Sequence, residues 1–149
     1  MPVRFLDSSG LARAYLRDEP GHEEVAALVR DGENLIASEL ARVEVARALA
    51  GACRVGRVSA ADRDRLLARL ANDLGPDGPI AIIALDPQPV LGRAQELVIE
   101  YPLGTLDAMH LAVAERASAI AGEEGLLFVT ADERQRDAAR RIGLEVAWR

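Results

Sequence analysis

The sequence predicts an α/β domain built on a parallel sheet. Two short segments, Ile80–Leu85 and Leu126–Val129, are apolar at every position, as strands buried on both faces are. Helical patterns alternate with such strands along the chain, which is typical of a parallel sheet covered by helices. The length of 149 residues suits one domain with a full core, and no repeat, low-complexity tract or linker divides the chain. We therefore assign residues 1–149 to a single domain.

Caps, breakers and periodicity place the remaining elements. Ser8 and Ser9 are predicted to cap the first helix, and Thr105 is predicted to cap the sixth. The predicted strands are Val3–Leu6, Asn34–Ala37, Ile80–Leu85, Leu126–Val129 and Leu144–Trp148. The predicted helices are Gly10–Arg17, Gly21–Arg30, Glu39–Val55, Ala60–Leu74, Pro87–Glu100, Leu106–Ala121 and Glu133–Ile142.

Composition narrows the class of protein. Half of the residues are hydrophobic, which is typical of a globular rather than a disordered chain. No apolar run has the length of a transmembrane helix, and the N-terminus is too short and too soon charged for a signal peptide. We therefore expect a cytoplasmic protein that does not contact membranes. Cys53 is the only cysteine, which excludes an internal disulfide and a thiolate metal cluster.

The charged residues exclude several kinds of binding and catalysis. The 18 basic and 24 acidic residues give a net charge of −6, unlike the basic surface of a general nucleic-acid-binding protein, so direct DNA binding is not expected. Aromatic residues make up only 3% of the chain, too few for a stacking platform for single strands. Every basic residue is an arginine, so the chain lacks the lysine that Schiff-base enzymes, P-loops and phosphoacceptor receiver domains use.

Four acidic residues lie where such a topology places its chemistry. Asp7 directly follows the first strand, and Asp132 follows the strand that ends near Val129. Asp107 and Glu44 lie early in helices, and on a helical wheel both face small or apolar neighbours. Ligands of parallel α/β sheets bind at the carboxyl ends of the strands, and an ionised carboxylate on an apolar face needs a partner or a metal. We therefore expect these four carboxylates to converge on one pocket.

Each of these residues also has a purely structural interpretation. Asp7 could cap a helix, and Asp132 forms a capping box with Gln135. Glu44 could pair with an arginine, and His110 is more readily a packed histidine than a ligand. These interpretations do not explain why two carboxylates follow strands while two others occupy inward helix faces.

Clustered carboxylates repel one another, so a cation is expected among them. Hard oxygen ligands, with a single cysteine and two histidines in the chain, favour Mg²⁺, or Mn²⁺, over zinc. Such ions promote phosphodiester hydrolysis by activating a water and stabilising the leaving oxygen. The cation would also allow an acidic protein to approach a polyanion.

Four segments of the chain resemble the four motifs of the PIN domain. They are Val3–Ser9, Ala37–Glu44, Leu106–Ala112 and Val129–Asp132. Each motif is weak by itself, but they occur in the family's order at fitting intervals and span almost the whole chain. At this size the chain most resembles the VapC-type toxins of bacterial and archaeal toxin–antitoxin pairs.

The resemblance implies a three-layer α/β/α sandwich with a central parallel sheet of four to five strands. It also implies a Mg²⁺-dependent ribonuclease that acts on RNA, forms a homodimer and is neutralised by a small antitoxin. The family's catalytic and metal-binding acidic residues correspond to Asp7, Glu44, Asp107 and Asp132. Its small hydroxyl residues near the metal correspond to Ser8 and Thr130.

Two functions of other classes remain open at this stage. A receiver domain also gathers aspartates around Mg²⁺, but the missing lysine and the single aspartate after the first strand argue against it. A third class, the phosphatases of the haloacid dehalogenase type, does not fit, because these need Asp-x-Asp after the first strand, whereas Asp7 is followed by Ser8 and Ser9. A non-catalytic binding module is compatible with the same acidic residues, because an intact acidic set does not prove turnover.

Two further expectations concern surfaces. The helix Glu39–Val55 is apolar nearly all round, which favours a homodimer. An acidic protein also needs local cations to hold RNA. We expect at least one of two arginine pairs, Arg47 with Arg54 or Arg134 with Arg141, to contact phosphates near the site.

Overall fold

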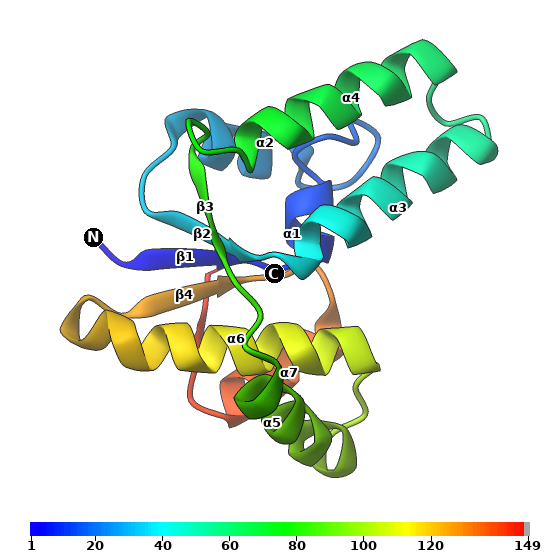
Figure 1. Cartoon of the computed structure of the whole chain (residues 1–149). Helices are drawn as coiled ribbons and strands as arrows, with labels where there is room; N and C mark the ends of the chain where they lie inside the picture. Colours follow the sequence, from blue (N-terminus) through cyan, green and yellow to red (C-terminus); the bar gives the residue numbers. More distant parts are fainter. Residues whose placement is uncertain (148–149) are drawn as a thin grey trace.

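A five-stranded parallel sheet lies between two layers of helices in this computed structural model, which describes residues 1–147 (Figure 1). The strand order is β3-β2-β1-β4-β5, and every neighbouring pair is parallel. The strands are β1 (Val3–Leu6), β2 (Leu35–Ser38), β3 (Ile80–Ile83), β4 (Leu126–Val129) and β5 (Glu145–Val146). The predicted three-layer architecture is confirmed.

The helices divide between the two faces of the sheet (Figure 1). One layer contains α1 (Ser8–Ala12), α2 (His22–Asp31), α3 (Leu40–Arg54) and α4 (Ala60–Asp73); the other contains α5 (Pro87–Glu100), α6 (Thr105–Ala121) and α7 (Glu133–Arg141). A short 3₁₀ turn, η1 (Gly122–Glu124), follows α6. Each layer packs its own hydrophobic cluster against the sheet, and Leu6 joins one cluster while its neighbour Phe5 joins the other. The central strand is therefore buried on both faces, as its apolar sequence requires.

The connections change face between β1 and β4. The crossovers from β1 to β2 and from β2 to β3 run through α1–α4, whereas those from β3 to β4 and from β4 to β5 run through α5–α7. The chain therefore leaves the neighbouring strands β1 and β4 toward opposite faces. The carboxyl ends of these two strands are the switch point where α/β sheets bind ligands, and we refer to this place as the crevice. Asp7 follows β1 and Thr130 follows β4 at this point.

The first helix differs from its prediction. It begins at Ser8 because Asp7 is the N-cap, whose side chain accepts the backbone N–H of Gly10, and it ends at Ala12. Ser8 and Ser9 thus lie in the first turn and do not cap it. Thr105 is likewise the first residue of α6, and its neighbour Gly104 is the N-cap, without a side-chain hydrogen bond.

The prediction for the third strand, Ile80–Leu85 buried on both faces, was wrong about its burial and about where it ends. β3 is an edge strand that ends at Ile83, and Ala81 is exposed. Its apolar residues reflect packing at the sheet edge, since Ile82 packs against the cluster of the α1–α4 layer and Ile83 against that of α5–α7. The other helices begin and end within two residues of their predicted bounds. Trp148, predicted to end the last strand, lies outside the described residues.

Among residues 1–147, no helix combines the length and the apolar character that crossing a lipid bilayer requires.

Candidate active site

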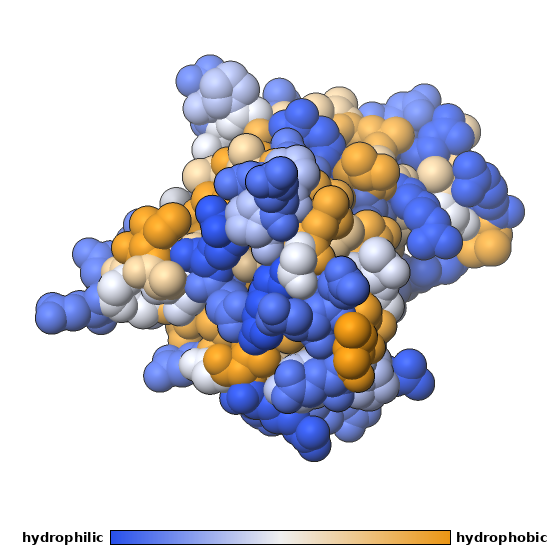
Figure 2. All heavy atoms as spheres, turned by 60° about the horizontal axis from the view of Figure 1, so that its bottom comes forward, coloured by the Kyte–Doolittle hydropathy of each residue, from blue (hydrophilic) through white to orange (hydrophobic). Residues whose placement is uncertain are grey.

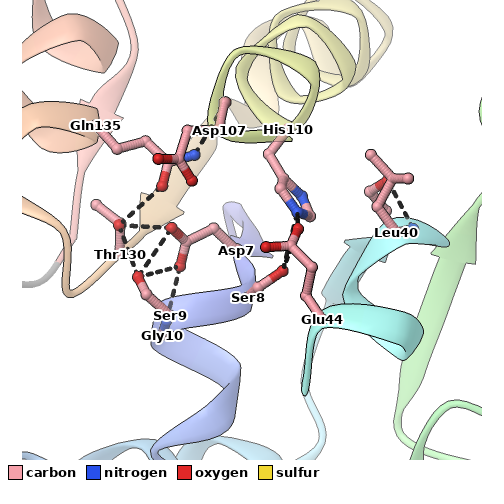
Figure 3. A network of polar contacts seen from close by, with 11 residues as sticks. Asp7, Ser8, Ser9, Gly10, Leu40, Glu44, Asp107, His110, Thr130 and Gln135 are labelled. Carbon is pink, nitrogen blue, oxygen red and sulfur yellow. Dashed lines mark hydrogen bonds and ion pairs between the residues drawn. The ribbon is translucent and has the colours of Figure 1, made fainter. Parts of the chain in front are cut away.

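Asp7 lies at the centre of the crevice, and its side chain is almost completely buried (Figure 3). Its Oδ1 accepts the backbone N–H of Gly10 at 2.7 Å, and its Oδ2 accepts the hydroxyl of Thr130 at 2.6 Å. The Ser9 hydroxyl lies 3.0 Å from both carboxyl oxygens. Burial raises the pKa of Asp7 from 3.8 to about 6, although the hydrogen bonds from Thr130, Gly10 and Ser9 act in the opposite direction. A cation beside this carboxyl would favour its charged form.

Hydroxyl groups join the end of β4 to the start of α1. Ser9 Oγ accepts the backbone N–H of Ala131 at 3.1 Å and lies 3.2 Å from Thr130 Oγ1. Thr130 Oγ1 also accepts the backbone N–H of Asp132 at 3.1 Å. Because these hydroxyls bond both to the backbone and to Asp7, they fix the orientation of its carboxyl group.

Gln135 ties the last helix to the sixth. It is fully buried, and its side-chain Nε2 donates to the backbone carbonyl of Asp107 at 3.1 Å. Its backbone N–H donates to Asp132 Oδ1 at 2.9 Å, so Asp132 caps α7. The reciprocal bond of the predicted capping box is not made, because the N–H of Asp132 donates to Thr130 instead. This cap uses one oxygen of Asp132 and leaves the other available.

Glu44 approaches the crevice from α3. Its Oε1 accepts the hydroxyl of Ser8 at 3.0 Å and lies 2.5 Å from Nε2 of His110, which lies 2.9 Å from Ser8 Oγ (Figure 3). Partial burial acts to raise the pKa of Glu44, but His110 and Ser8 outweigh it, with a further contribution from Arg47, and lower that pKa below its ordinary value. Glu44 therefore stays charged at neutral pH.

Asp107, in the first turn of α6, is half-buried. Burial raises the pKa of its carboxyl above the ordinary value, and the negative charges of Asp132 and Glu44 raise it further. Asp132 and Glu44 are thus each close enough to Asp107 for their charges to act on its carboxyl group. Within residues 1–147, the side chain of Asp107 accepts no hydrogen bond, so it is the member of the set least committed to the fold.

The acidic residues have the chemistry of a hard-cation site, but their side chains are not gathered into finished coordination. Among residues 1–147, no three acidic, histidine or cysteine side chains are close enough to hold one ion. Ser8 and His110 hold Glu44, the cap of α7 holds Asp132, and hydroxyls surround Asp7. Oxygen donors of this kind suit a hard divalent cation, and a cation would favour the charged forms that burial disfavours at Asp7 and Asp107.

Three residues of this network were absent from the predicted site: Ser9, Gly10 and Gln135. Ser9 belongs to the segment that resembles the first PIN motif, and the sequence pattern marks Gln135 only as part of a capping box. His110, expected to be packed, is buried and also bonded to Ser8 and Glu44.

A comparison with known families identifies the family of this chain. A model described as the PIN domain matches residues 4–141. The chain belongs to the PIN-domain family. It is also 33% identical to Ribonuclease VapC46 of Mycobacterium tuberculosis over 150 aligned positions, which cover 98% of this chain and 97% of that protein.

Solved structures share the fold of this PIN domain. PAE2754 from Pyrobaculum aerophilum superposes with a TM-score of 0.67 at 21% identity, covering 99% of this chain and 83% of that one. A FitAB complex bound to an IR36 DNA fragment gives a TM-score of 0.65 at 16% identity, with coverages of 98% and 94%. FitAcB from Neisseria gonorrhoeae gives 0.60 at 21% identity, with coverages of 98% and 96%. Membership of the PIN family removes the receiver-domain alternative.

Proposed function

We propose that this PIN domain is a metal-dependent endoribonuclease that cleaves RNA phosphodiester bonds and is the toxin of a toxin–antitoxin pair. The observation that carries the proposal is the set of carboxylates at the crevice between β1 and β4, where burial raises the pKa values of Asp7 and Asp107 and the charges of Asp132 and Glu44 raise that of Asp107 further. Such a set is costly without a cation. The identity with a VapC ribonuclease over nearly the whole chain supports the same activity.

Asp7 and Asp107 would hold the ion, with Glu44 and Asp132 completing its surroundings. Mg²⁺ is the proposed cofactor, and Mn²⁺ is a suitable substitute. When bound, the ion supplies an activated water and stabilises the charge that develops on the phosphate and the leaving oxygen. Ser9, Thr130 and the N–H of Gly10 hold the Asp7 carboxyl in one orientation, while Ser8 holds Glu44. The proposed auxiliary roles of Ser8 and Thr130 are thus to orient carboxylates.

The sharpest test replaces Asp107 by Asn, because that side chain makes no hydrogen bond within residues 1–147. Asp62→Asn is the matched control, since Asp62 also lies in the first turn of a helix but on α4, outside the carboxylate network. We expect the wild type and Asp62→Asn to cleave single-stranded RNA of mixed sequence with Mg²⁺ and not with EDTA. The Asp107→Asn variant should fold but no longer cleave RNA. The same result is expected for Asp7→Ala and for Glu44→Ala.

The competing proposal is a non-catalytic module that binds RNA. If the wild type bound this RNA without cleaving it in Mg²⁺ or Mn²⁺, the module would replace the enzyme. If all three acidic variants kept wild-type cleavage, the proposed site would be wrong.

The proposed partners follow from the VapC-type assignment. They are the RNA substrate, a second copy of the chain and a small antitoxin protein, all in the cytoplasm. The net charge of −6 disfavours direct contact of this chain with DNA, so we assign any DNA binding by the pair to the antitoxin.

We propose a homodimer, but the structure favours a different contact surface from the one that the sequence indicates. α3 buries one face, and its other face exposes Val43 among arginines, so it is more charged than its sequence suggests. Most of the large exposed hydrophobic side chains instead lie on α5 and α6: Leu91, Val98, Ile99, Leu106 and Ile120. Figure 2 views this side of the molecule, where apolar patches alternate with charged groups. Ile120 also lines a shallow apolar groove of about 260 Å³ with Val90 and Ile83. We propose this exposed apolar side of α5 and α6, including the groove, as the dimer surface.

A further inference from the structure

His110 joins the two helical layers at the carboxyl edge of the sheet. It lies one turn after Asp107 on α6, and its side chain is 1% exposed. Its Nε2 contacts Glu44 on α3 and Ser8 on α1, both of which belong to the opposite layer (Figure 3). α3 packs mainly into the α1–α4 cluster and α6 into the α5–α7 cluster. The contact between His110 and Glu44 therefore connects two bodies that pack on opposite faces of the sheet.

We propose that His110 is a positioning residue that donates its Nε2–H to Glu44 and so holds this carboxylate beside Asp107. The inference rests on the proposed metal-dependent function, because it concerns the spacing of two residues assigned to the metal. Asp107 and His110 are fixed to each other by a single helical turn, so a bond from His110 to Glu44 sets the separation of the two carboxylates.

The hydrogen bonding assigns the donor. A charged carboxylate has no hydrogen to give, so the hydrogen between Glu44 Oε1 and Nε2 belongs to the ring. The other ring nitrogen, Nδ1, is buried and has no hydrogen-bond partner within residues 1–147. All polar contacts of His110 with the site thus pass through one nitrogen, whose lone pair is not free to bind a metal while it carries that hydrogen. His110 acts through Glu44 and not as a ligand of its own.

Glu44 needs such a donor because it has a competing partner. Its side chain is 22% exposed, and glutamate has several rotatable bonds to order. The exposed Arg47, on the same helix, lowers the pKa of Glu44 through its charge and therefore lies within electrostatic reach. Without the donor at Nε2, Glu44 is expected to turn toward Arg47 and the solvent, away from Asp107.

The test uses the shape of the imidazole ring. In His110→Gln the amide nitrogen takes the place of Nε2, whereas in His110→Asn it takes the place of Nδ1. His110→Leu removes both nitrogens and keeps an apolar side chain. The measurements are the dissociation constant of Mn²⁺, by calorimetry, and the thermal midpoint in EDTA.

We expect His110→Gln to bind Mn²⁺ nearly as well as the wild type. His110→Asn and His110→Leu should weaken Mn²⁺ binding about 10- to 100-fold, the usual effect of removing the partner of a metal ligand. A purely structural histidine predicts a different order, in which Mn²⁺ affinity follows the thermal midpoint. Equal affinities for the Gln and Asn variants would overturn the proposal.

A double-mutant cycle separates this proposal from the proposed function. Urea unfolding of the wild type, His110→Leu, which removes the donor, Glu44→Ala and the double variant in EDTA reports the coupling between the two side chains without metal or RNA. We expect the single losses not to add. Additive losses would refute the hydrogen bond, whatever the protein cleaves. A wild type that shows the coupling but neither binds Mn²⁺ nor cleaves RNA would refute the nuclease instead, and with it the metal-positioning role.

Discussion

The buried carboxyl group of Asp7 is costly to ionise in the folded protein. Its pKa in the folded protein, about 6, lies above its ordinary value of 3.8, chiefly because the carboxyl is buried. A group with a raised pKa contributes stability that is complete below pH 3.8 and is lost as the pH rises through 6. Each pKa unit corresponds to about 1.4 kcal/mol, so the loss reaches up to about 3 kcal/mol above pH 7. A bound cation would offset this loss by stabilising the charged form.

Replacement of Asp7 by Asn should remove this pH dependence. In EDTA at pH 8, Asp7→Asn should be more stable than the wild type by roughly 1–3 kcal/mol, and the difference should shrink toward pH 5. Urea unfolding of both proteins across this range measures the difference, and Asp62→Asn controls for the loss of one charge. Mg²⁺ should stabilise the wild type at pH 8 and leave Asp7→Asn unchanged. Parallel stability profiles for the two proteins would contradict the assignment.

At the level of residues, sequence position indicated the acidic candidates but not their hydrogen-bond partners. Asp7, Glu44, Asp107 and Asp132 could be proposed as site residues because strand ends and inward helix faces are local properties. Ser9 was missed because its hydroxyl meets Thr130, 121 residues away, and only folding brings the two together. Asp7 also shows that two interpretations weighed as alternatives can coexist, since it caps α1 and occupies the crevice.

At the level of elements, the close approach of α1 to β4 shapes the crevice. A Cβ atom on Gly10 would lie 2.7 Å from the backbone oxygen of Val129 and 3.1 Å from Asp7 Oδ1. Backbone cannot yield to such a contact without moving a strand. The absence of a side chain at residue 10 therefore lets the first turn of α1 lie against the end of β4, where its N–H reaches Asp7.

Gly10→Ala should therefore separate α1 from β4. We expect a loss of roughly 1–3 kcal/mol in unfolding free energy, the usual cost of overpacking, together with weaker Mn²⁺ binding. Gly51→Ala in α3 and Gly92→Ala in α5 are matched controls, because a Cβ at either position meets no atom within 4 Å. Those two variants should gain up to about 1 kcal/mol from helix propensity. A Gly10→Ala variant as stable as these controls would show that α1 is not held in this way.

The elements themselves were predictable where local signals determine them. Ser59 accepts the N–H of Asp62 and starts α4 as expected, and Pro87 opens α5. The errors arose where tertiary contacts decide. α1 begins at Ser8 because Asp7, which also belongs to the crevice, is its N-cap, and the burial of β3 depends on its place at the sheet edge, which its own apolar sequence does not encode.

At the scale of the whole molecule, the dimer surface on α5 and α6 can be tested by adding charge. Ile120 is 86% exposed beside the apolar groove, and Val43 on α3 is 69% exposed on the opposite layer. Light scattering at micromolar concentration should give a dimer for the wild type and for Val43→Asp, and a monomer for Ile120→Asp. A monomeric wild type would refute the dimer proposal and leave the active-site proposal unaffected. Dissociation by Val43→Asp, with Ile120→Asp still dimeric, would move the interface to α3.

Binding of a polyanion by a protein of net charge −6 requires local cations around the carboxylates. Both predicted arginine pairs are exposed, and one member of each lies near the site. The charge of Arg47 reaches Glu44, and Arg134 lies in the first turn of α7, directly after the cap formed by Asp132. Arg54 and Arg141 lie about two turns further along the same helices, in a direction that leads away from the crevice.

We therefore expect at least one of the two pairs to position the RNA backbone without reading its sequence. In an Asp7→Asn background that does not cleave, Arg47→Ala with Arg54→Ala, or Arg134→Ala with Arg141→Ala, should weaken RNA binding similarly across sequences. For every phosphate that an arginine no longer neutralises, the plot of log affinity against log salt should become shallower by about 0.7. Arg63→Ala with Arg65→Ala on α4 is the control, because it removes the same charge from arginines that pair with Asp64 and Asp62. Unchanged affinity and slope in both test pairs, or an equal change in the control, would refute this placement of the RNA.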